Sequence, residues 1–183
     1  MTDESGSAVG SDEEANAGPE ANDSLPEDAR TGTFLVTHAD DASAVVRDVE
    51  TAQVHTLASN PDCETGDVLV ATIAPEPPLE VTWRVVSVTD RRDVEVVDSD
   101  LEPTRRSLEV GESTPVGELT TFERAGRGEV HVLSIPEETV DSAAQEVLAD
   151  PETVARAARL GAVRVEVRRS AEDGVLSVRY LPE

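Results

Sequence analysis

The sequence predicts an α+β protein in which a small antiparallel β-barrel precedes a strand–helix–helix–strand–strand unit. Short β-branched segments separated by turns recur up to residue 98, which is typical of a small barrel or sandwich. Apolar residues at helical spacing and then alternating valines follow in the last third of the chain. We therefore expect four parts, namely an acidic tail (1–31), the barrel (32–98), a connector (99–128) and the α+β unit (129–183).

The tail is expected to be disordered and solvated. The first thirty residues hold nine acidic residues against one arginine, and Met1, Val9 and Leu25 are their only large apolar residues. Such a segment cannot bury enough apolar surface to offset the conformational entropy lost on folding. Solvation alone and an interaction arm are both compatible with a charge run of this kind.

The barrel is predicted from six β-strands. Glu50 and Thr51 form a two-residue connection, which makes the second and third strands a hairpin. Trp83 alternates with Val81 and Val85, so we expect it to be the main anchor of the barrel core. The expected strands are residues 33–37, 43–49, 53–57, 68–73, 79–88 and 94–97.

The connector has weaker secondary-structure patterns than the segments on either side. Residues 104–110 are compatible with a short helix, and residues 111–115 with a turn. Two alternatives fit the segment that follows. Thr120 and Glu123 have the spacing of a capping box that would begin a one-turn helix, whereas residues 119–122 also have the composition of a strand.

The α+β unit begins with an apolar strand over residues 129–135. A helix follows, because its apolar residues recur on one face, at Val140, Ala143, Ala144, Val147 and Leu148. Asp150 and Pro151 are an N-cap and a first-turn proline, which predict a second helix ending at Gly161. Alternating residues then predict strands over 163–168 and 176–180.

The charge of the chain indicates the solvent for which it is suited. Its 183 residues carry 39 acidic residues against 15 basic ones, a formal net charge of −24, and every basic residue is an arginine. Self-repulsion opposes compaction in dilute buffer, but at ~1 M salt the Debye length falls to ~3 Å. We therefore expect an acidic, halophilic, cytoplasmic protein. The alternative, an acidic disordered chain, does not explain the valine-rich segments.

Composition also argues against several classes of protein. The uncharged apolar stretch of residues 68–75 is far shorter than the ~20 apolar residues of a membrane-spanning helix. The first thirty residues lack both the basic start and the apolar core of a secretory signal, so we expect neither signal nor membrane association. The single Cys63 excludes a disulfide framework and a zinc site built mainly from cysteines.

Four segments of the chain resemble an uncharacterised family of small acidic haloarchaeal proteins. The resemblance extends over nearly everything after residue 31 and implies a compartment and a solvent rather than an activity. The segments that carry it are Gly32–Asp40, Asp48–Val49, Gln53–Leu57 and Gly126–Leu133.

A looser resemblance is to the small OB-like barrels of the TRAM type. It rests on Ala44–Arg47, on the hairpin to Val54–Leu57, and on Gly66–Val70. It implies association with tRNA or other RNA, although the chain lacks the basic, glycine-rich loops of those proteins. The acidic pI of about 4.2 does not oppose this, since counterion release contributes little to binding in molar salt.

No catalytic or metal-binding motif is found, so we predict no cofactor, no metal and no enzymatic activity. His38, His55, His131 and Cys63 show no paired ligand spacing. The acidic neighbours of Cys63 should raise its pKa and reduce its thiolate fraction.

An arginine patch is the one candidate binding site. Residues 151–183 hold six arginines against five acidic residues, in contrast to the strongly acidic remainder. Arg164 and Arg168 share a strand face, Arg179 lies on the next strand, and Arg156 and Arg159 lie on the preceding helix. Such a patch could bind phosphate or an acidic protein surface. The alternative is pairing within the chain, of Arg164 with Glu166 and of Arg156 and Arg159 with Glu152.

We therefore expect a non-catalytic binding or adaptor module that acts through a protein partner. The alternative is an RNA-associated small-barrel protein connected with tRNA or the ribosome, and an enzyme with an unrecognised site is the third possibility. The sequence does not indicate an oligomeric state.

Overall fold

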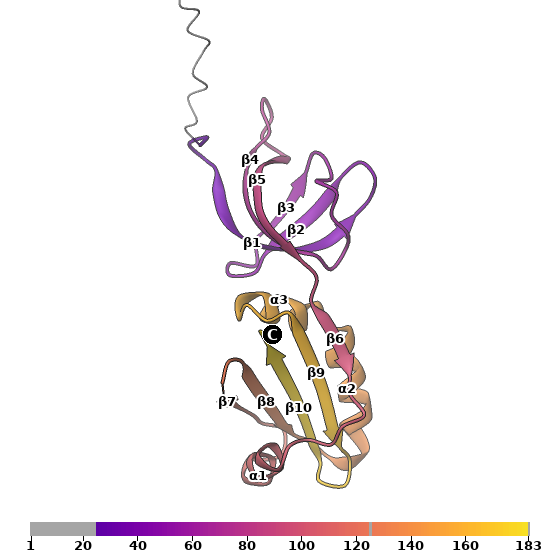
Figure 1. Ribbon diagram of the computed structural model, residues 1–183. Coiled ribbons are helices and arrows are strands. Elements are labelled where there is room, and N and C mark those ends of the chain that lie inside the picture. Colours follow the sequence, from indigo (N-terminus) through magenta and orange to yellow (C-terminus); the bar gives the residue numbers. More distant parts are fainter. Residues whose placement is uncertain (1–24, 125, 183) are drawn as a thin grey trace, which may run out of the picture.

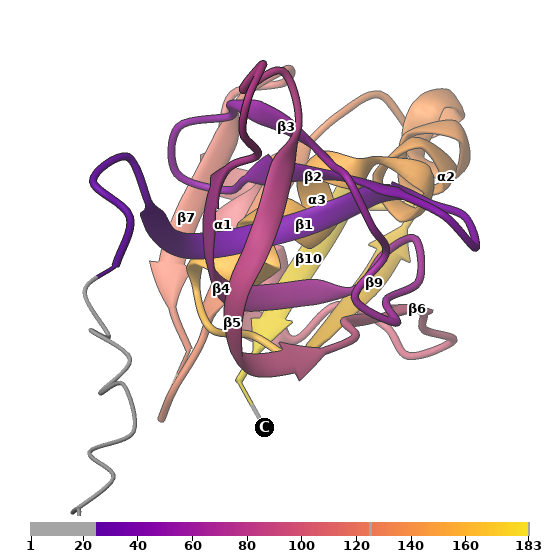
Figure 2. The same ribbon diagram turned by 90° about the horizontal axis from the view of Figure 1, so that it is seen from above.

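The computed structural model describes residues 25–124 and 126–182, and within them the chain is a mixed α+β protein with two sheets and three short helices. The two sheets lie end to end (Figure 1), and the N-terminal sheet overlies the C-terminal sheet in the view from above (Figure 2). Most of the expected tail lies outside the described residues. Arg30 and Thr31, assigned to the tail from the sequence, are the first residues of a strand.

The N-terminal sheet closes into a ring of five strands. Its strands follow the order β1-β2-β3-β5-β4, and β4 pairs back to β1. The expected antiparallel pairing is wrong at one point, because β3 and β5 meet in parallel at Leu57 and Trp83. The strands are β1 (Arg30–Ala39), β2 (Ala44–Asp48), β3 (Val54–Leu57), β4 (Val68–Pro75) and β5 (Trp83–Arg92).

Phe34, rather than Trp83, anchors the core of this ring. Phe34 is 1% exposed, whereas Trp83 is half-buried and packs against the edge of the core cluster. The residues before Trp83 also differ from expectation, since β5 begins only there. Leu79 and Val81 lie in a loop, 77% and 75% exposed, which the Glu76 N–H closes by donating to the Thr82 carbonyl.

The C-terminal sheet has the order β6-β9-β10-β8-β7. The assignment of β6 to the barrel is therefore wrong, because β6 pairs in parallel with β9. Val94, which directly precedes β6, and Val96 within it pack against the core of this sheet. Its strands are β6 (Glu95–Asp98), β7 (Leu119–Glu123), β8 (Glu129–Ser134), β9 (Arg164–Ser170) and β10 (Val175–Leu181).

The connector is part of the C-terminal unit. The expected helix forms as α1 (Arg105–Ser113), capped by the Thr104 hydroxyl, which accepts from the Ser107 N–H. It extends beyond the expected end through Gly111, where an added Cβ would lie 2.4 Å from Val175 Cγ2. Glycine therefore allows α1 to approach β10 closely. Of the two alternatives for the next segment, the strand is correct, and it is β7.

Two further helices cover one face of the C-terminal sheet. They are α2 (Val140–Ala149), preceded by the single 3₁₀ turn η1 (Glu137–Thr139), and α3 (Pro151–Arg159). The predicted cap is confirmed, since the Asp150 carboxylate accepts from the Glu152 N–H at 2.9 Å. Alanines of these helices pack on Val165 and Val167 of β9, which leaves the alternate side chains of β9 on the opposite face.

Helix α3 also joins the two sheets. Its Ala155 and Ala158 pack against Leu35 and Val49 of the N-terminal unit. The Arg159 guanidinium donates to the Val49 carbonyl at 2.7 Å.

Candidate anion-binding site

The face of the C-terminal sheet opposite α2 and α3 carries the candidate site. One row of directly opposed residues crosses all five strands, in the order Phe122, Val130, Arg179, Glu166 and Val97. Side chains in such a row point to the same face of a sheet. The row therefore places an aromatic ring at the β7 edge and an arginine–carboxylate pair at the centre.

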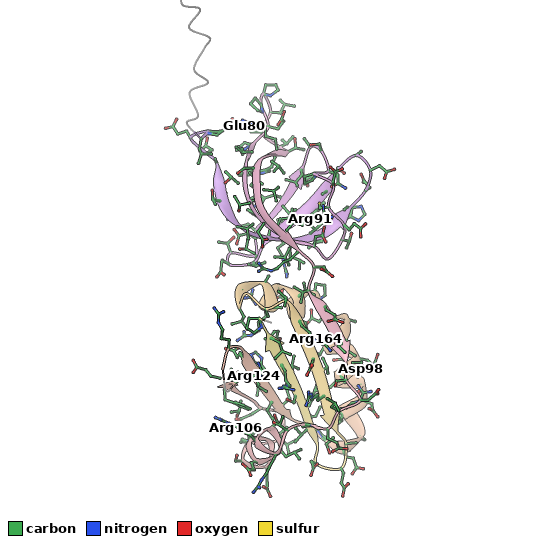
Figure 3. All side chains as sticks on the ribbon, in the orientation of Figure 1. Glu80, Arg91, Asp98, Arg106, Arg124 and Arg164 are labelled. Carbon is green, nitrogen blue, oxygen red and sulfur yellow. The ribbon has the colours of Figure 1, made fainter. Side chains whose placement is uncertain are left out.

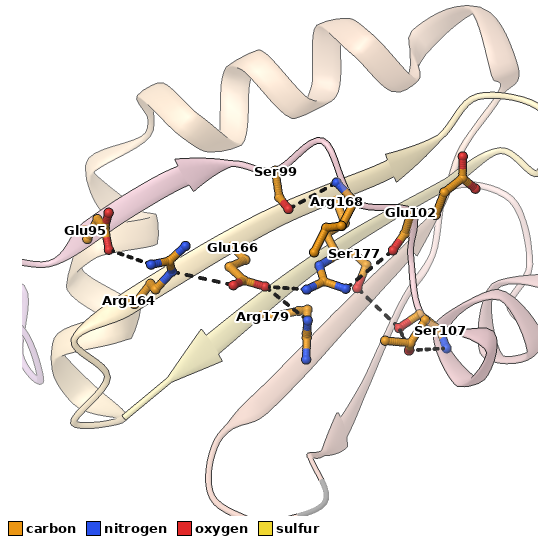
Figure 4. A network of polar contacts seen from close by, with 11 residues as sticks. Glu95, Ser99, Glu102, Ser107, Arg164, Glu166, Arg168, Ser177 and Arg179 are labelled. Carbon is orange, nitrogen blue, oxygen red and sulfur yellow. Dashed lines mark hydrogen bonds and ion pairs between the residues drawn. The ribbon is translucent and has the colours of Figure 1, made fainter. Parts of the chain in front are cut away.

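Glu166 is the shared ion-pair partner of three arginines (Figure 4). Arg168 and Arg179 donate to its Oε2 at 2.8 Å and 3.1 Å. The Nε of Arg164 lies 3.5 Å from its Oε1, and Arg164 has Glu95 as a second partner at 3.0 Å. Since Arg168 and Arg179 are both 12% exposed and share one carboxylate, the centre of the face carries excess positive charge.

A pocket of about 300 Å³ adjoins this centre on the side of β7. Three of its lining residues are arginines, and none is acidic. The residues that line it are Thr104, Arg106, Phe122, Arg124, Val130 and Arg179. The Arg106 guanidinium lies over the Phe122 ring, 4.6 Å from its centroid. Arg106 and Arg124 lie on the same side of the C-terminal unit (Figure 3).

Burial and neighbouring positive charge act together on the pKa of Arg179. Burial lowers the pKa of Arg179 first, and Arg168 and then Arg124 lower it further, while Glu166 acts in the opposite direction. Arginine nevertheless keeps its charge at any physiological pH. An anion in the pocket would relieve the repulsion between these guanidinium groups and could accept bidentate hydrogen bonds from them.

The structure divides the five arginines that the sequence grouped together. Arg164 and Arg168 share one face, as expected, and Arg179 lies on the same face. Arg156 lies on the other side of the sheet, where it donates to Glu129 at 2.9 Å and to the Nε2 of His131 at 3.1 Å. Arg159 lies at the junction of the two sheets. These two residues therefore take no part in the candidate site.

Pairing within the chain, the alternative interpretation of the patch, is partly confirmed. Glu166 does pair with Arg164, and Arg159 lies 3.8 Å from Glu152. Arg156 pairs with Glu129 rather than with Glu152. A second partner of Glu152 is Arg47, which comes from the N-terminal unit.

Sequence reasoning missed three of the pocket residues, Arg106, Phe122 and Arg124. All three lie in the segment treated as a connector. The signal available was the pair Arg105–Arg106 followed by the alternation of residues 119–123, but neither indicated that this segment joins β8 and β10.

The histidines do not converge. His38 lies at the exposed end of β1, His131 lies in β8, and His55 is buried between Phe34 and Trp83. Among the described residues, no group of three or more His, Cys, Asp or Glu side chains could hold a metal ion. Neither ring nitrogen of His55 has a hydrogen-bond partner among the residues that the structure describes. Burial lowers the pKa of His55.

Cys63 is buried, and its thiol donates to the Asn60 side-chain oxygen at 3.2 Å. Its pKa is raised, mainly by burial and secondly by Asp67. The direction agrees with the sequence prediction, but burial is a larger cause than the charges of neighbouring residues. The thiol is therefore not activated as a nucleophile.

A profile of a family of unknown function (DUF5812) matches residues 30–169. The matched segment includes every strand of both sheets except β10 and the last residue of β9. No curated protein and no solved structure matches the chain. Within residues 25–124 and 126–182, none of the helices has the length and apolar character needed to cross a membrane.

Proposed function

The chain belongs to this family of unknown function, so its role must be inferred from its own residues, and we propose that it is a non-catalytic binding module that captures an anionic group of a protein partner. One observation carries the proposal: three arginines and no acidic residue line a single pocket. In a chain of net charge −24, such a concentration of guanidinium groups is unusual.

The chemistry of arginine suits this role in a concentrated salt solution. Screening at ~1 M salt removes long-range attraction beyond ~3 Å, so affinity must come from direct contact. Guanidinium groups make bidentate hydrogen bonds to anions and are more weakly hydrated than ammonium groups. We propose that this module works in the cytoplasm of a halophile, where the acidic remainder of its surface would keep it soluble.

An RNA-associated small barrel is the second candidate, and one observation favours it. Trp83 is half-buried at the ring, and the Arg30 guanidinium lies over it, 5.5 Å from its ring centroid, so that a base could stack on the guanidinium plane. The closed five-stranded ring is compatible with an OB- or TRAM-like barrel. Arg30 and Trp83 line a pocket together with Asp28 and Glu80, whose carboxylates would repel a phosphate, which favours the first proposal.

Affinity capture from a native high-salt extract tests the proposal. The bait proteins are the wild type, the double variant Arg106→Gln/Arg124→Gln, and the control Arg105→Gln. Arg105 is a suitable control because it neighbours Arg106 in α1, is 93% exposed and does not line the pocket.

We expect a protein partner that the wild type and the control retain and the double variant loses. Equal retention by the double variant would contradict the assignment of the pocket. Retention that ribonuclease abolishes would favour the RNA-associated role instead.

A further inference from the structure

The pocket differs from a simple carboxylate receptor in the number of guanidinium groups that border it. A carboxylate is a planar monoanion that one arginine can satisfy through two parallel hydrogen bonds. Here Arg106 of α1, Arg124 in the loop after β7 and Arg179 of β10 line the same pocket. A phosphate monoester has three terminal oxygens and a charge of about −1.5 to −2, so it can accept from several guanidinium groups at once.

We infer that the anionic group held in this pocket is a phosphate monoester on a side chain of the protein partner. This inference rests on the proposed function and specifies its ligand. The three guanidinium groups supply the hydrogen-bond donors. Thr104 places the first turn of α1 at the pocket, and the partial positive charge of a helix N-terminus adds to theirs.

Phe122 holds the site together without being free to stack on a ligand. It packs against the apolar cluster of Val130, Val132 and Val175, and Arg106 lies over its ring. The ring therefore positions the Arg106 guanidinium. A nucleotide base finds no open aromatic face on this side, and the phosphodiesters of RNA carry only one charge each.

The position of the pocket also suits a protein segment. Phe122 belongs to β7, which is an edge strand of the C-terminal sheet. An edge strand leaves one side of its backbone unpaired by the sheet, and an extended peptide can pair with such an edge. A phosphorylated residue in a segment that lies along β7 would reach the arginine-lined pocket.

The test uses short, blocked, fluorescently labelled peptides and the full chain in molar potassium chloride, with binding measured by fluorescence anisotropy. Three peptides differ only at one position, which is phosphoserine, aspartate or serine. Inorganic phosphate and a single-stranded oligouridylate serve as competitors. The protein variants are Arg106→Gln, Arg124→Gln and the control Arg105→Gln, each checked for native circular dichroism.

We expect the phosphoserine peptide to bind at least about tenfold more tightly than the aspartate peptide, and the serine peptide to bind least. Arg106→Gln and Arg124→Gln should each weaken phosphoserine binding about tenfold, and Arg105→Gln should leave it unchanged. Inorganic phosphate should displace the peptide, and oligouridylate should not.

Each contrary result overturns a distinct statement. Equal binding of the aspartate and phosphoserine peptides would overturn the phosphate assignment and leave anion capture intact. Inorganic phosphate that binds more tightly than the phosphoserine peptide would show that the ligand is the free ion. Displacement by oligouridylate would favour RNA. Binding that none of the arginine variants changes would overturn both the inference and the proposed function.

Discussion

Arg179 lies directly opposite Glu166 across the β9–β10 ladder and donates to its Oε2 at 3.1 Å. Arg168 donates to the same oxygen at 2.8 Å. One mostly buried carboxylate thus serves two mostly buried guanidinium groups at the centre of the candidate site. Glu166 therefore holds the arginines in place and also limits how much positive charge they present to a ligand.

Replacing Glu166 by glutamine should destabilise the protein by about 3 kcal/mol, because it leaves buried guanidinium groups without a charged acceptor. The measurement is urea unfolding in molar salt. Glu95→Gln is the matched control, since Glu95 is 59% exposed and should contribute less than about 1 kcal/mol through its pair with Arg164. Equal decreases in the free energy of unfolding of the two variants would show that burial around Glu166 does not strengthen its interactions.

Replacing Gly111 by alanine tests the close contact of α1 with the sheet. Alanine is the better helix former by about 1 kcal/mol, yet its Cβ would lie 2.4 Å from Val175 Cγ2. We expect a net destabilisation of about 1–2 kcal/mol, because the clash must displace α1. The exposed Glu112→Ala on the same helix should change stability by less than about 0.5 kcal/mol. A Gly111→Ala protein more stable than the wild type would show that α1 is free to move.

Replacing Arg159 by alanine separates its structural role from the binding role that the sequence suggested. Losing the hydrogen bond to the Val49 carbonyl should cost about 1 kcal/mol of stability. Binding of anions to the arginine pocket should remain unchanged, since Arg159 lies at the junction of the sheets. If the Arg159→Ala variant lost anion binding and kept its stability, Arg159 would belong to the binding surface after all.

Acid should destabilise the fold through its buried histidines. Burial is the main cause that lowers the pKa of both His55 and His131 below the ordinary value of 6.5. The folded chain then binds fewer protons than the unfolded chain, so this contribution is complete above pH 6.5 and is lost as the pH falls below it.

Urea unfolding at a series of pH values above and below 6.5 would measure the effect. His55→Leu should make stability less dependent on pH, because it removes one of the two groups. A free energy of unfolding that stays constant as the pH falls below 6.5 would contradict the prediction.

Removal of salt should unfold the chain. A net charge of −24 opposes compaction once the Debye length grows from ~3 Å at ~1 M salt to ~30 Å at ~0.01 M. Far-ultraviolet circular dichroism should lose its β-sheet signal on dialysis and recover it when potassium chloride is restored. Sucrose at matched osmolality is the control, since it does not screen charge. A spectrum that does not change with salt would contradict the halophilic assignment.

Local sequence patterns predicted most of the elements. The cap at Asp150 and Pro151 marks the start of α3 because both residues act within one helical turn. The alternation from Val163 to Val167 identifies β9 because side-chain direction repeats every two residues. The same alternation placed Arg164 and Arg168 on one face, which is confirmed.

The arginine pocket could not be predicted in the same way. Its residues come from α1 and its N-cap, from β7 and the loop after it, and from β8 and β10, and nothing in a local pattern connects them. The sequence grouped Arg156 and Arg159 with Arg164 because they are close along the chain. They are separated in space because α3 lies on the opposite face of the sheet, with Arg159 at its end.

The sequence by itself determined the charge of the chain, the type of most of its elements and the shared face of Arg164 and Arg168. Only the tertiary structure decided that β6 and the connector belong to the C-terminal sheet and that Arg106, Arg124 and Arg179 border one pocket. The physical reason is that periodicity records which side of an element is apolar, whereas the partner that covers that side is chosen by packing between distant segments.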